Sequence, residues 1–127
     1  MPSVLITDDD DTFRATIALA LEDAGYDTYE ACNGKEALHL LATIRIDLIL
    51  LDIIMPEMEG IETIKQIAGK YTEIPVITIS GNTAQMDTNV YLKMTTHYGA
   101  KATLKKPFSV QTLLQLVQLH VKEQTII

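Results

Sequence analysis

The stretch Asp47–Gly60, with the sequence DLILLDIIMPEMEG, decides the fold. Residues 48–51 form an unbroken apolar run, which is typical of a strand buried on both faces of a parallel sheet. The run ends at Asp52, and Pro56 then stops strand pairing before an amphipathic helix with isoleucines at positions 61, 64 and 67. Asp52 has two interpretations. It either turns the chain after a strand, or it places a carboxylate at the edge where open α/β sheets bind their ligands.

Composition bounds the class of protein. At 127 residues and 47% hydrophobic, the chain has enough apolar residues for the core of one domain spanning residues 1–127. The net charge of -7 argues against direct binding to nucleic acid or to an anionic membrane. One cysteine, Cys32, excludes an internal disulfide framework and indicates a reducing cytoplasm. No apolar run approaches the roughly 18 residues of a membrane span, and the chain start lacks the basic residues of a signal peptide. We therefore expect a cytoplasmic domain that does not insert into membranes.

The rest of the chain alternates between strand and helix patterns. Four further strands are predicted at residues 4–7, 26–31, 74–79 and 102–105. Helical spacing of apolar residues follows each strand, and Ser109 is expected to cap the last helix. Five such alternations predict an α/β fold with a doubly wound parallel sheet and right-handed crossovers.

Charged and polar side chains stand at the carboxyl ends of four of these strands. They are Asp8, Asp9, Asp52, Ser80 and Lys106. The carboxyl ends of parallel strands meet at one edge, so we expect these side chains to converge. Three close carboxylates raise one another's pKa unless a cation lies among them. Hard oxygen ligands of this kind fit Mg²⁺, or Mn²⁺, better than zinc or a closed Ca²⁺ cage.

This constellation matches the needs of phosphoryl transfer. Asp52 can act as a nucleophile toward phosphorus, because carboxylates form aspartyl-phosphates. Lys106 supplies a positive charge and Ser80 a hydroxyl for the phosphoryl oxygens. Each residue alone has an ordinary interpretation: a solvated helix start capped by Asp10 or Asp11, an exposed loop lysine, and a loop serine. Their joint placement at four strand ends is what the ordinary interpretations explain poorly.

In sequence, the chain resembles the receiver domain of two-component response regulators over essentially its full length. Four motifs carry the resemblance: VLITDDD at 4–10, LDIIMPEMEG at 51–60, ITISG at 77–81 and LKKPF at 104–108. The resemblance implies a flavodoxin-like (βα)5 fold whose parallel five-stranded sheet has the order 2-1-3-4-5.

The resemblance also implies roles and partners. Asp52 would accept a phosphoryl group from a sensor histidine kinase or a histidine phosphotransfer protein. Asp8, Asp9, Asp52 and the backbone carbonyl of Ile54 would hold Mg²⁺, Ser80 would move toward the phosphate, and Lys106 would pair with it. Output would pass to a downstream protein through the face made by the fourth helix, fifth strand and fifth helix, and a phosphorylation-dependent dimer is compatible with this. Such a domain is not an enzyme beyond its own self-catalysed phosphorylation and dephosphorylation.

Three departures from the family pattern bear on these expectations. Thr103 stands where the family often has an aromatic switch residue, and Glu59 stands where aspartate is usual. The segment from Ser80 to Lys106 is about one helical turn longer than expected, so residues 80–87 form either a longer loop or an extended fourth helix.

Other readings compete with the phosphoacceptor. A small aspartyl-phosphate phosphatase would need a second acid two residues after Asp52, where Ile54 stands. A nucleotide-binding module is disfavoured by the acidic strand ends and by the lack of a G-x-G-x-x-G motif. A receiver-like scaffold that works without phosphorylation is the third alternative. We expect either a stand-alone regulator or a receiver excised from a longer chain, and Met1 with the short tail favours the first.

Two smaller expectations concern side chains outside the site. Cys32 is expected to be a small buried apolar residue that closes the second strand. The three histidines, His39, His97 and His120, are expected to be solvated helix residues.

Overall fold

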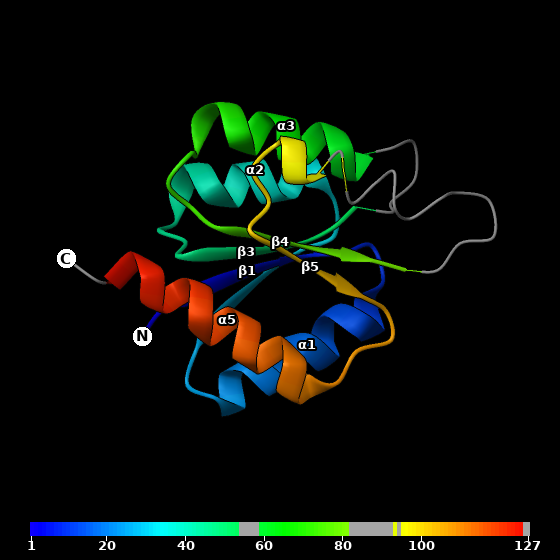
Figure 1. Cartoon of the computed structure of the whole chain (residues 1–127), viewed down its shortest axis with the longest axis vertical. Helices are drawn as coiled ribbons and strands as arrows, with labels where there is room; N and C mark the ends of the chain where they lie inside the picture. Colours follow the sequence, from blue (N-terminus) through cyan, green and yellow to red (C-terminus); the bar gives the residue numbers. More distant parts are fainter. Residues whose placement is uncertain (54–58, 82–92, 94, 126–127) are drawn as a thin grey trace.

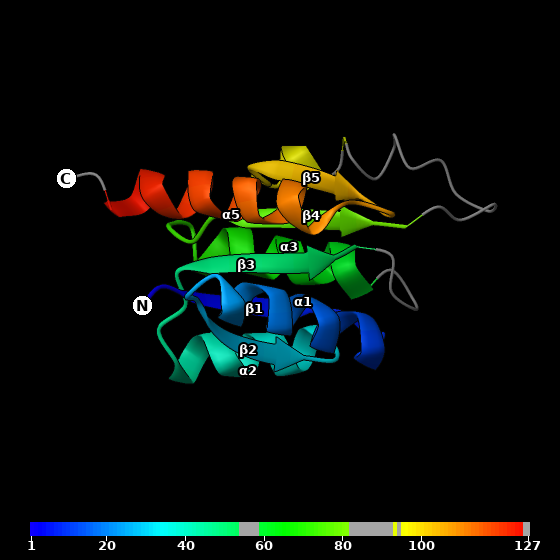
Figure 2. The same ribbon diagram turned by 90° about the horizontal axis from the view of Figure 1, so that it is seen from below.

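The structure is a computed structural model that describes residues 1–53, 59–81, 93 and 95–125. Its centre is a sheet of five parallel strands in the order β2-β1-β3-β4-β5, which confirms the predicted topology. The strands are β1 (Ser3–Thr7), β2 (Asp27–Ala31), β3 (Leu48–Asp52), β4 (Val76–Ser80) and β5 (Ala102–Lys105). All five point the same way, so their carboxyl ends share one edge (Figure 2).

Helices cover both faces of the sheet. They are α1 (Asp11–Asp23), α2 (Gly34–Thr43), α3 (Glu59–Lys70) and α5 (Val110–Thr125). Helices α2 and α3 cover one face, and α1 and α5 cover the other (Figure 1). The predicted fourth helix falls mostly on residues outside the described part. Of its described residues, 93 and 95–97 are helical. Within the described residues, no helix has both the length and the apolar character needed to cross a bilayer.

The core is divided between the two faces by the alternation along each strand. Leu48 and Leu50 pack with the residues of α1 and α5, whereas Ile49 and Leu51 pack with those of α2 and α3. All four side chains are fully buried. Burial of each such side chain contributes about 1.5–3 kcal/mol, and β3 contributes two of them to each half-core.

Local polar contacts set where the helices begin. Asp10, and not Asp11, is the N-cap of α1, since its carboxylate accepts a hydrogen bond from the Phe13 N–H at 3.0 Å. Ser109 caps α5 as predicted, because its hydroxyl oxygen accepts from the Thr112 N–H at 3.0 Å. These caps satisfy N–H groups that have no partner inside the helix.

Candidate functional site

The predicted site residues lie at the carboxyl edge of the sheet. Asp52 and Ser80 are the last residues of β3 and β4, and Asp8 and Lys106 directly follow β1 and β5. Pairing is in register to the very end of the sheet, because Asp52 aligns with Ile79 and Ser80 with Lys105. The edge therefore assembles side chains that are far apart in the sequence.

Three carboxylates form the acidic part of the site. Asp8, Asp9 and Asp52 each offer an oxygen, and these atoms all lie within 4.8 Å of one another. Asp8 and Asp52 are buried, with 1% and 3% of their surface exposed, while Asp9 lies toward solvent. Partial desolvation raises the pKa of Asp9 above its ordinary value, and the nearby charge of Asp8 raises this pKa further. A set made only of carboxylate oxygens fits a hard divalent cation such as Mg²⁺ or Mn²⁺.

Lys106 supplies the positive charge of the site. Its Nζ lies 3.2 Å from Oδ2 of Asp8 and 3.6 Å from Oδ2 of Asp52. The Lys106 N–H donates to the Ser80 carbonyl at 2.8 Å, which extends the β4–β5 ladder up to the lysine. One ammonium among three carboxylates leaves an excess of negative charge, which a bound cation would neutralise.

The Ser80 hydroxyl is an unsatisfied group beside these charges. Ser80 is 1% exposed, and its Oγ has no hydrogen-bond partner among the described residues. The hydroxyl of Thr7, at the end of β1, shares this condition. A buried polar group without a partner costs about 1–3 kcal/mol. A group that binds at this edge would give the Ser80 hydroxyl the partner that the described residues do not supply.

Arg14 holds the acidic loop to its surroundings, a role that sequence reasoning missed. Its Nη1 donates to the Asp8 carbonyl at 2.6 Å, while the same guanidinium contacts Asp11 at 2.7 Å and Glu30 at 3.1 Å. The only local sequence signal for these contacts is the spacing of Asp11 and Arg14, because residues three apart on a helix can form an ion pair. The contacts to Asp8 and Glu30 depend on the fold.

Gly60 allows α3 to start directly against the end of β3. A Cβ at this position would lie 2.5 Å from the Ile53 Cα and 2.7 Å from the Asp52 carbonyl oxygen. Both are backbone atoms that cannot move aside cheaply. Glycine in the 51–60 motif therefore has a packing reason, namely the close approach of the helix to the strand that carries Asp52.

Some predictions fall on other parts of the chain. The Ile54 carbonyl and residues 82–87 of the lengthened segment lie outside the described residues. Thr103, in the position of the family's aromatic residue, is half-buried, and its hydroxyl hydrogen-bonds with that of Thr78 at 3.2 Å. It therefore ties β5 to β4 by a polar contact that an aromatic ring could not make.

The prediction for Cys32 was wrong. The buried residue that ends β2 is Ala31, whereas Cys32 is half-buried and its thiol donates to Glu36 Oε2 at 3.3 Å. This hydrogen bond, together with partial desolvation and the charge of Glu36, raises the pKa of the Cys32 thiol above its ordinary value.

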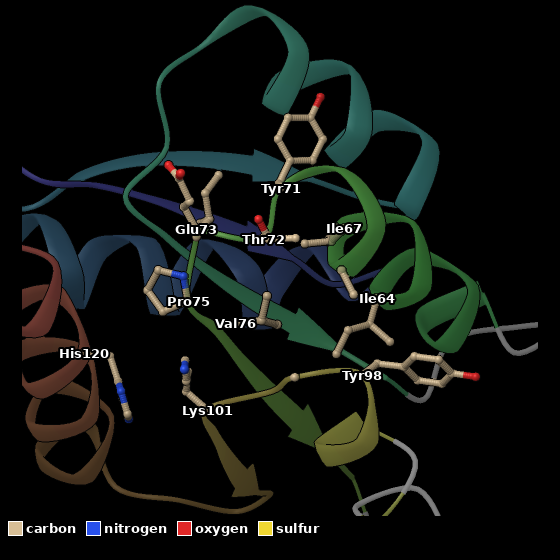
Figure 3. A pocket seen from close by; sticks show the side chains of 13 residues that line it. Ile64, Ile67, Tyr71, Thr72, Glu73, Pro75, Val76, Tyr98, Lys101 and His120 are labelled. Atoms are coloured by element: carbon tan, nitrogen blue, oxygen red, sulfur yellow. The ribbon is translucent and has the colours of Figure 1, made fainter.

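A cavity lies at the opposite edge of the sheet. It has a volume of about 440 Å³ and is lined by residues that precede β4 and β5, and by residues of α3 and α5 (Figure 3). His120, which projects from α5 into this region, is only 7% exposed, so the prediction that it is solvated was wrong. His39 and His97 are exposed as expected. None of the five strand-end residues lines this cavity.

The family model for the response regulator receiver domain matches residues 4–118, so the chain belongs to this family of two-component signalling domains. The resemblance found in the sequence is thereby confirmed.

Named relatives are similar over most of this chain. Regulatory protein AtoC of Escherichia coli (strain K12) is 37% identical over 122 residues, which cover 96% of this chain and 26% of AtoC. Alkaline phosphatase synthesis transcriptional regulatory protein PhoP of Bacillus subtilis (strain 168) is 32% identical, covering 84% of this chain and 42% of PhoP. The chain thus spans less than half the length of these two curated relatives.

Solved structures agree in fold over nearly the whole chain. The receiver domain of the Francisella response regulator 1452 is 34% identical with a TM-score of 0.86, covering 98% of this chain and 100% of that one. A CheY-like response regulator receiver domain protein from Methanospirillum hungatei JF-1 is 26% identical with a TM-score of 0.88, covering 98% and 96%.

Proposed function

We propose that Asp52 accepts a phosphoryl group from a phosphohistidine on a sensor histidine kinase or a histidine phosphotransfer protein, in a reaction that depends on Mg²⁺ or Mn²⁺. The observation that carries this proposal is the arrangement around Asp52. Its buried carboxylate lies within the three-acid cluster, 3.6 Å from the Lys106 ammonium, at the same edge as the orphaned Ser80 hydroxyl.

In this mechanism an Asp52 carboxylate oxygen attacks phosphorus, and the P–N bond breaks with its electron pair going to the imidazole. Lys106 pairs with the phosphoryl oxygens, and the Ser80 hydroxyl donates a hydrogen bond to one of them. Asp8, Asp9 and Asp52 would hold the cation, with the Ile54 carbonyl as a further ligand. When bound, the cation neutralises charge that develops on the transferring group.

Phosphorylation would change the charge of this edge and so switch the domain. An aspartyl-phosphate adds roughly -1.5 to -2 of charge, by analogy with other phosphorylated side chains. Lys106 follows β5 directly, so its movement toward the phosphate would be passed to β5 and α5. We propose that the face made by the fourth helix, β5 and α5 then binds a downstream protein, or a second copy of this domain.

The hydroxyl–hydroxyl contact of Thr103 and Thr78 lies in the middle of this path. Because no aromatic ring is available at position 103 to turn inward, we propose that Ser80 and Lys106 carry the signal in this chain.

We propose that residues 1–127 act as one cytoplasmic receiver domain that regulates and does not process a separate substrate. PhoP of Bacillus subtilis is by name a transcriptional regulatory protein. Control of transcription is accordingly a candidate output for the pathway of this domain. The net charge of -7 favours reaching that output through a protein partner over direct contact with DNA.

Intact-mass measurement after incubation with acetyl phosphate tests this proposal. The wild type with Mg²⁺ should gain one phosphate, whereas Asp52→Asn, and the wild type with a chelator, should gain none. Asp27→Asn is the matched control, because Asp27 is an exposed aspartate at the start of β2, at the opposite edge. It should be phosphorylated like the wild type.

A rapidly hydrolysed phosphate would escape detection by mass, so a beryllofluoride titration follows. Beryllofluoride binding by the wild type and not by Asp52→Asn would support the acceptor role. If the wild type shows neither an adduct nor beryllofluoride binding, the phosphorylation-independent scaffold becomes the better description.

A further inference from the structure

The site contains an aromatic ring to which the proposed mechanism gives no role. Phe13 lies in the first turn of α1, and the Lys106 Nζ sits over the face of its ring, 3.9 Å from the ring centroid. The same ring meets Phe108 edge-to-face, with centroids 5.9 Å apart and an interplanar angle of 89°. One side chain thus contacts both the Lys106 ammonium and the chain two residues beyond it.

Hydrogen bonds connect this ring to the acidic loop. The Asp10 N–H donates to Asp8 Oδ1 at 2.9 Å, and the Phe13 N–H donates to Asp10 Oδ1 at 3.0 Å. The Lys106 ammonium, which lies over the Phe13 ring, in turn donates to Asp8 Oδ2 at 3.2 Å. The position of the lysine and the position of Asp8 are therefore both tied to the start of α1.

The ring matters because the other partners of Lys106, the carboxylates of Asp8 and Asp52, would also be ligands of the divalent cation. A cation held by the acids would draw their oxygens away from the ammonium, and a lysine side chain has a long flexible stem that could then move to solvent. The face of a phenylalanine ring attracts an ammonium through its quadrupole. The ring has no ligand atom for the divalent cation and no hydrogen-bond donor for a phosphoryl group. It can hold the lysine without blocking the chemistry.

We propose that Phe13 is a positioning residue for Lys106, and that its ring face keeps the ammonium beside Asp52 when the acids bind a cation. This inference rests on the proposed function of Asp52 and Lys106. Phe13 itself does not touch the group that would be transferred.

The first test compares variants at position 13 in the whole domain. Phe13→Leu keeps apolar bulk and removes the ring face, Phe13→Tyr keeps the face, and site-specific incorporation of 3,4,5-trifluorophenylalanine keeps the ring while weakening its negative face. With Mg²⁺ present, beryllofluoride affinity should fall about 3- to 30-fold for the leucine and trifluoro variants, the range expected for a shielded ammonium on a ring. The tyrosine variant should recover most of the affinity.

Two controls separate positioning from packing. In a Lys106→Met background, Phe13→Leu should have no further effect on beryllofluoride affinity. Mg²⁺ affinity should change less than twofold in the position-13 variants, since Lys106 is not a cation ligand. Tyr71→Leu is the matched aromatic control, because Lys70 lies over the Tyr71 ring, 5.7 Å from its centroid, near the opposite edge. It should bind beryllofluoride like the wild type.

A proton spectrum reads the contact without any phosphate chemistry. The methylene protons next to the Lys106 ammonium, assigned by their loss in Lys106→Met, should show a ring-current shift to lower frequency in the wild type. That shift should vanish in Phe13→Leu. Failure of the wild type to bind beryllofluoride would count against the proposed function. The ring-current shift would still show whether Lys106 lies over the Phe13 ring.

Two results would overturn the inference. One is wild-type beryllofluoride affinity in the trifluoro variant, which would mean that the ring acts only by its shape. The other is the absence of the ring-current shift from the wild-type spectrum.

Discussion

The two edges of the sheet are made by the same five strands, yet they differ in whether their polar groups have hydrogen-bond partners. At the edge where the strands begin, the Ser3 N–H donates to Asp47 Oδ2 and the Asp47 N–H donates to the Ser3 carbonyl, both at 2.8 Å. At the edge where the strands end, the buried hydroxyls of Thr7 and Ser80 have no partner among the described residues. Three carboxylates also crowd together there.

The two edges differ in how far the described residues satisfy each other's polar groups. At the first edge, Ser3 and Asp47 satisfy each other's groups and so hold the start of β1 beside the residue that precedes β3. Under the proposed function, the groups at the second edge bind a cation and a phosphoryl group, at a cost to the stability of the unliganded domain. Matched changes at the two edges should therefore have unequal and often opposite effects.

The largest expected effect concerns the two glycines of α3, one near each edge. Gly60→Ala would drive a Cβ to 2.5 Å from the Ile53 Cα, and the backbone at the end of β3 would have to shift. We expect a loss of about 3 kcal/mol or more in the free energy of unfolding, the upper range for overpacking. Urea unfolding followed by circular dichroism measures it.

Gly69→Ala is the counterpart near the other end of the same helix. No atom lies within 4 Å of the added Cβ there, and Gly69 is exposed. Alanine in place of glycine should raise the free energy of unfolding by about 0.5–1 kcal/mol. Equal effects at the two positions would contradict the tight approach of α3 to β3.

The next effect is that of the divalent cation. Mg²⁺ should raise the unfolding free energy by about 2.7 kcal/mol at a free concentration of one hundred times its dissociation constant, because it binds only the folded acids. Asp9→Asn should abolish most of this gain. Asp9 is chosen because it lies toward solvent, so its replacement should leave the fold intact.

Asp47→Asn is the control at the first edge. It should lower the unfolding free energy with and without Mg²⁺, since it weakens the bond with Ser3, and it should keep the gain from the cation. A cation effect that survives Asp9→Asn and disappears with Asp47→Asn would reverse the assignment of the two edges.

The two arginines of the chain give a third pair. Arg14→Ala should cost about 1.5 kcal/mol, because it removes a hydrogen bond from a charged donor to the buried end of β1. Arg45→Ala should change the unfolding free energy by less than about 0.5 kcal/mol, because Arg45 is 92% exposed and its Nε lies 3.8 Å from Asp47. Unfolding in urea measures both, and similar losses would mean that Arg14 acts only as a surface charge.

The smallest effect is on the reactivity of Cys32, at the carboxyl edge. The pKa of its thiol is raised by the contact with Glu36, so less thiolate is present at a given pH than in an ordinary cysteine. Glu36→Gln should lower this pKa and speed reaction with a thiol reagent several-fold at pH 8. The midpoint of rate against pH should move to lower pH.

Glu73→Gln, a change of the same kind at the opposite edge, should leave the rate unchanged. An unaltered rate in Glu36→Gln would show that desolvation, and not the carboxylate, controls the thiol.

How much of this could be predicted from the sequence depends on how local each feature is. The apolar run Leu48–Leu51 and the alternation of strand and helix patterns determined the α/β class, because buried parallel strands must be apolar on both faces. Parallel strand order then brought Asp8, Asp52, Ser80 and Lys106 to one edge, since all carboxyl ends of such a sheet point the same way. These steps need only periodicity and topology.

Burial and pairing of individual side chains needed the fold. Cys32 and His120 were misjudged because their burial depends on which neighbours the sheet and helices bring to them, and not on their own sequence context. The choice of Asp10 over Asp11 as the cap of α1 likewise depends on backbone geometry, which adjacent aspartates do not distinguish.

The sequence by itself therefore determined the class of fold, the family and the set of strand-end residues. Only the tertiary structure decided how these residues are held: Lys106 between two carboxylates and the ring of Phe13, and Asp8 fastened by Arg14. The physical reason is that such contacts join residues distant in the chain, and their distances follow from the packing of α1 and β5 at one edge and from no local pattern.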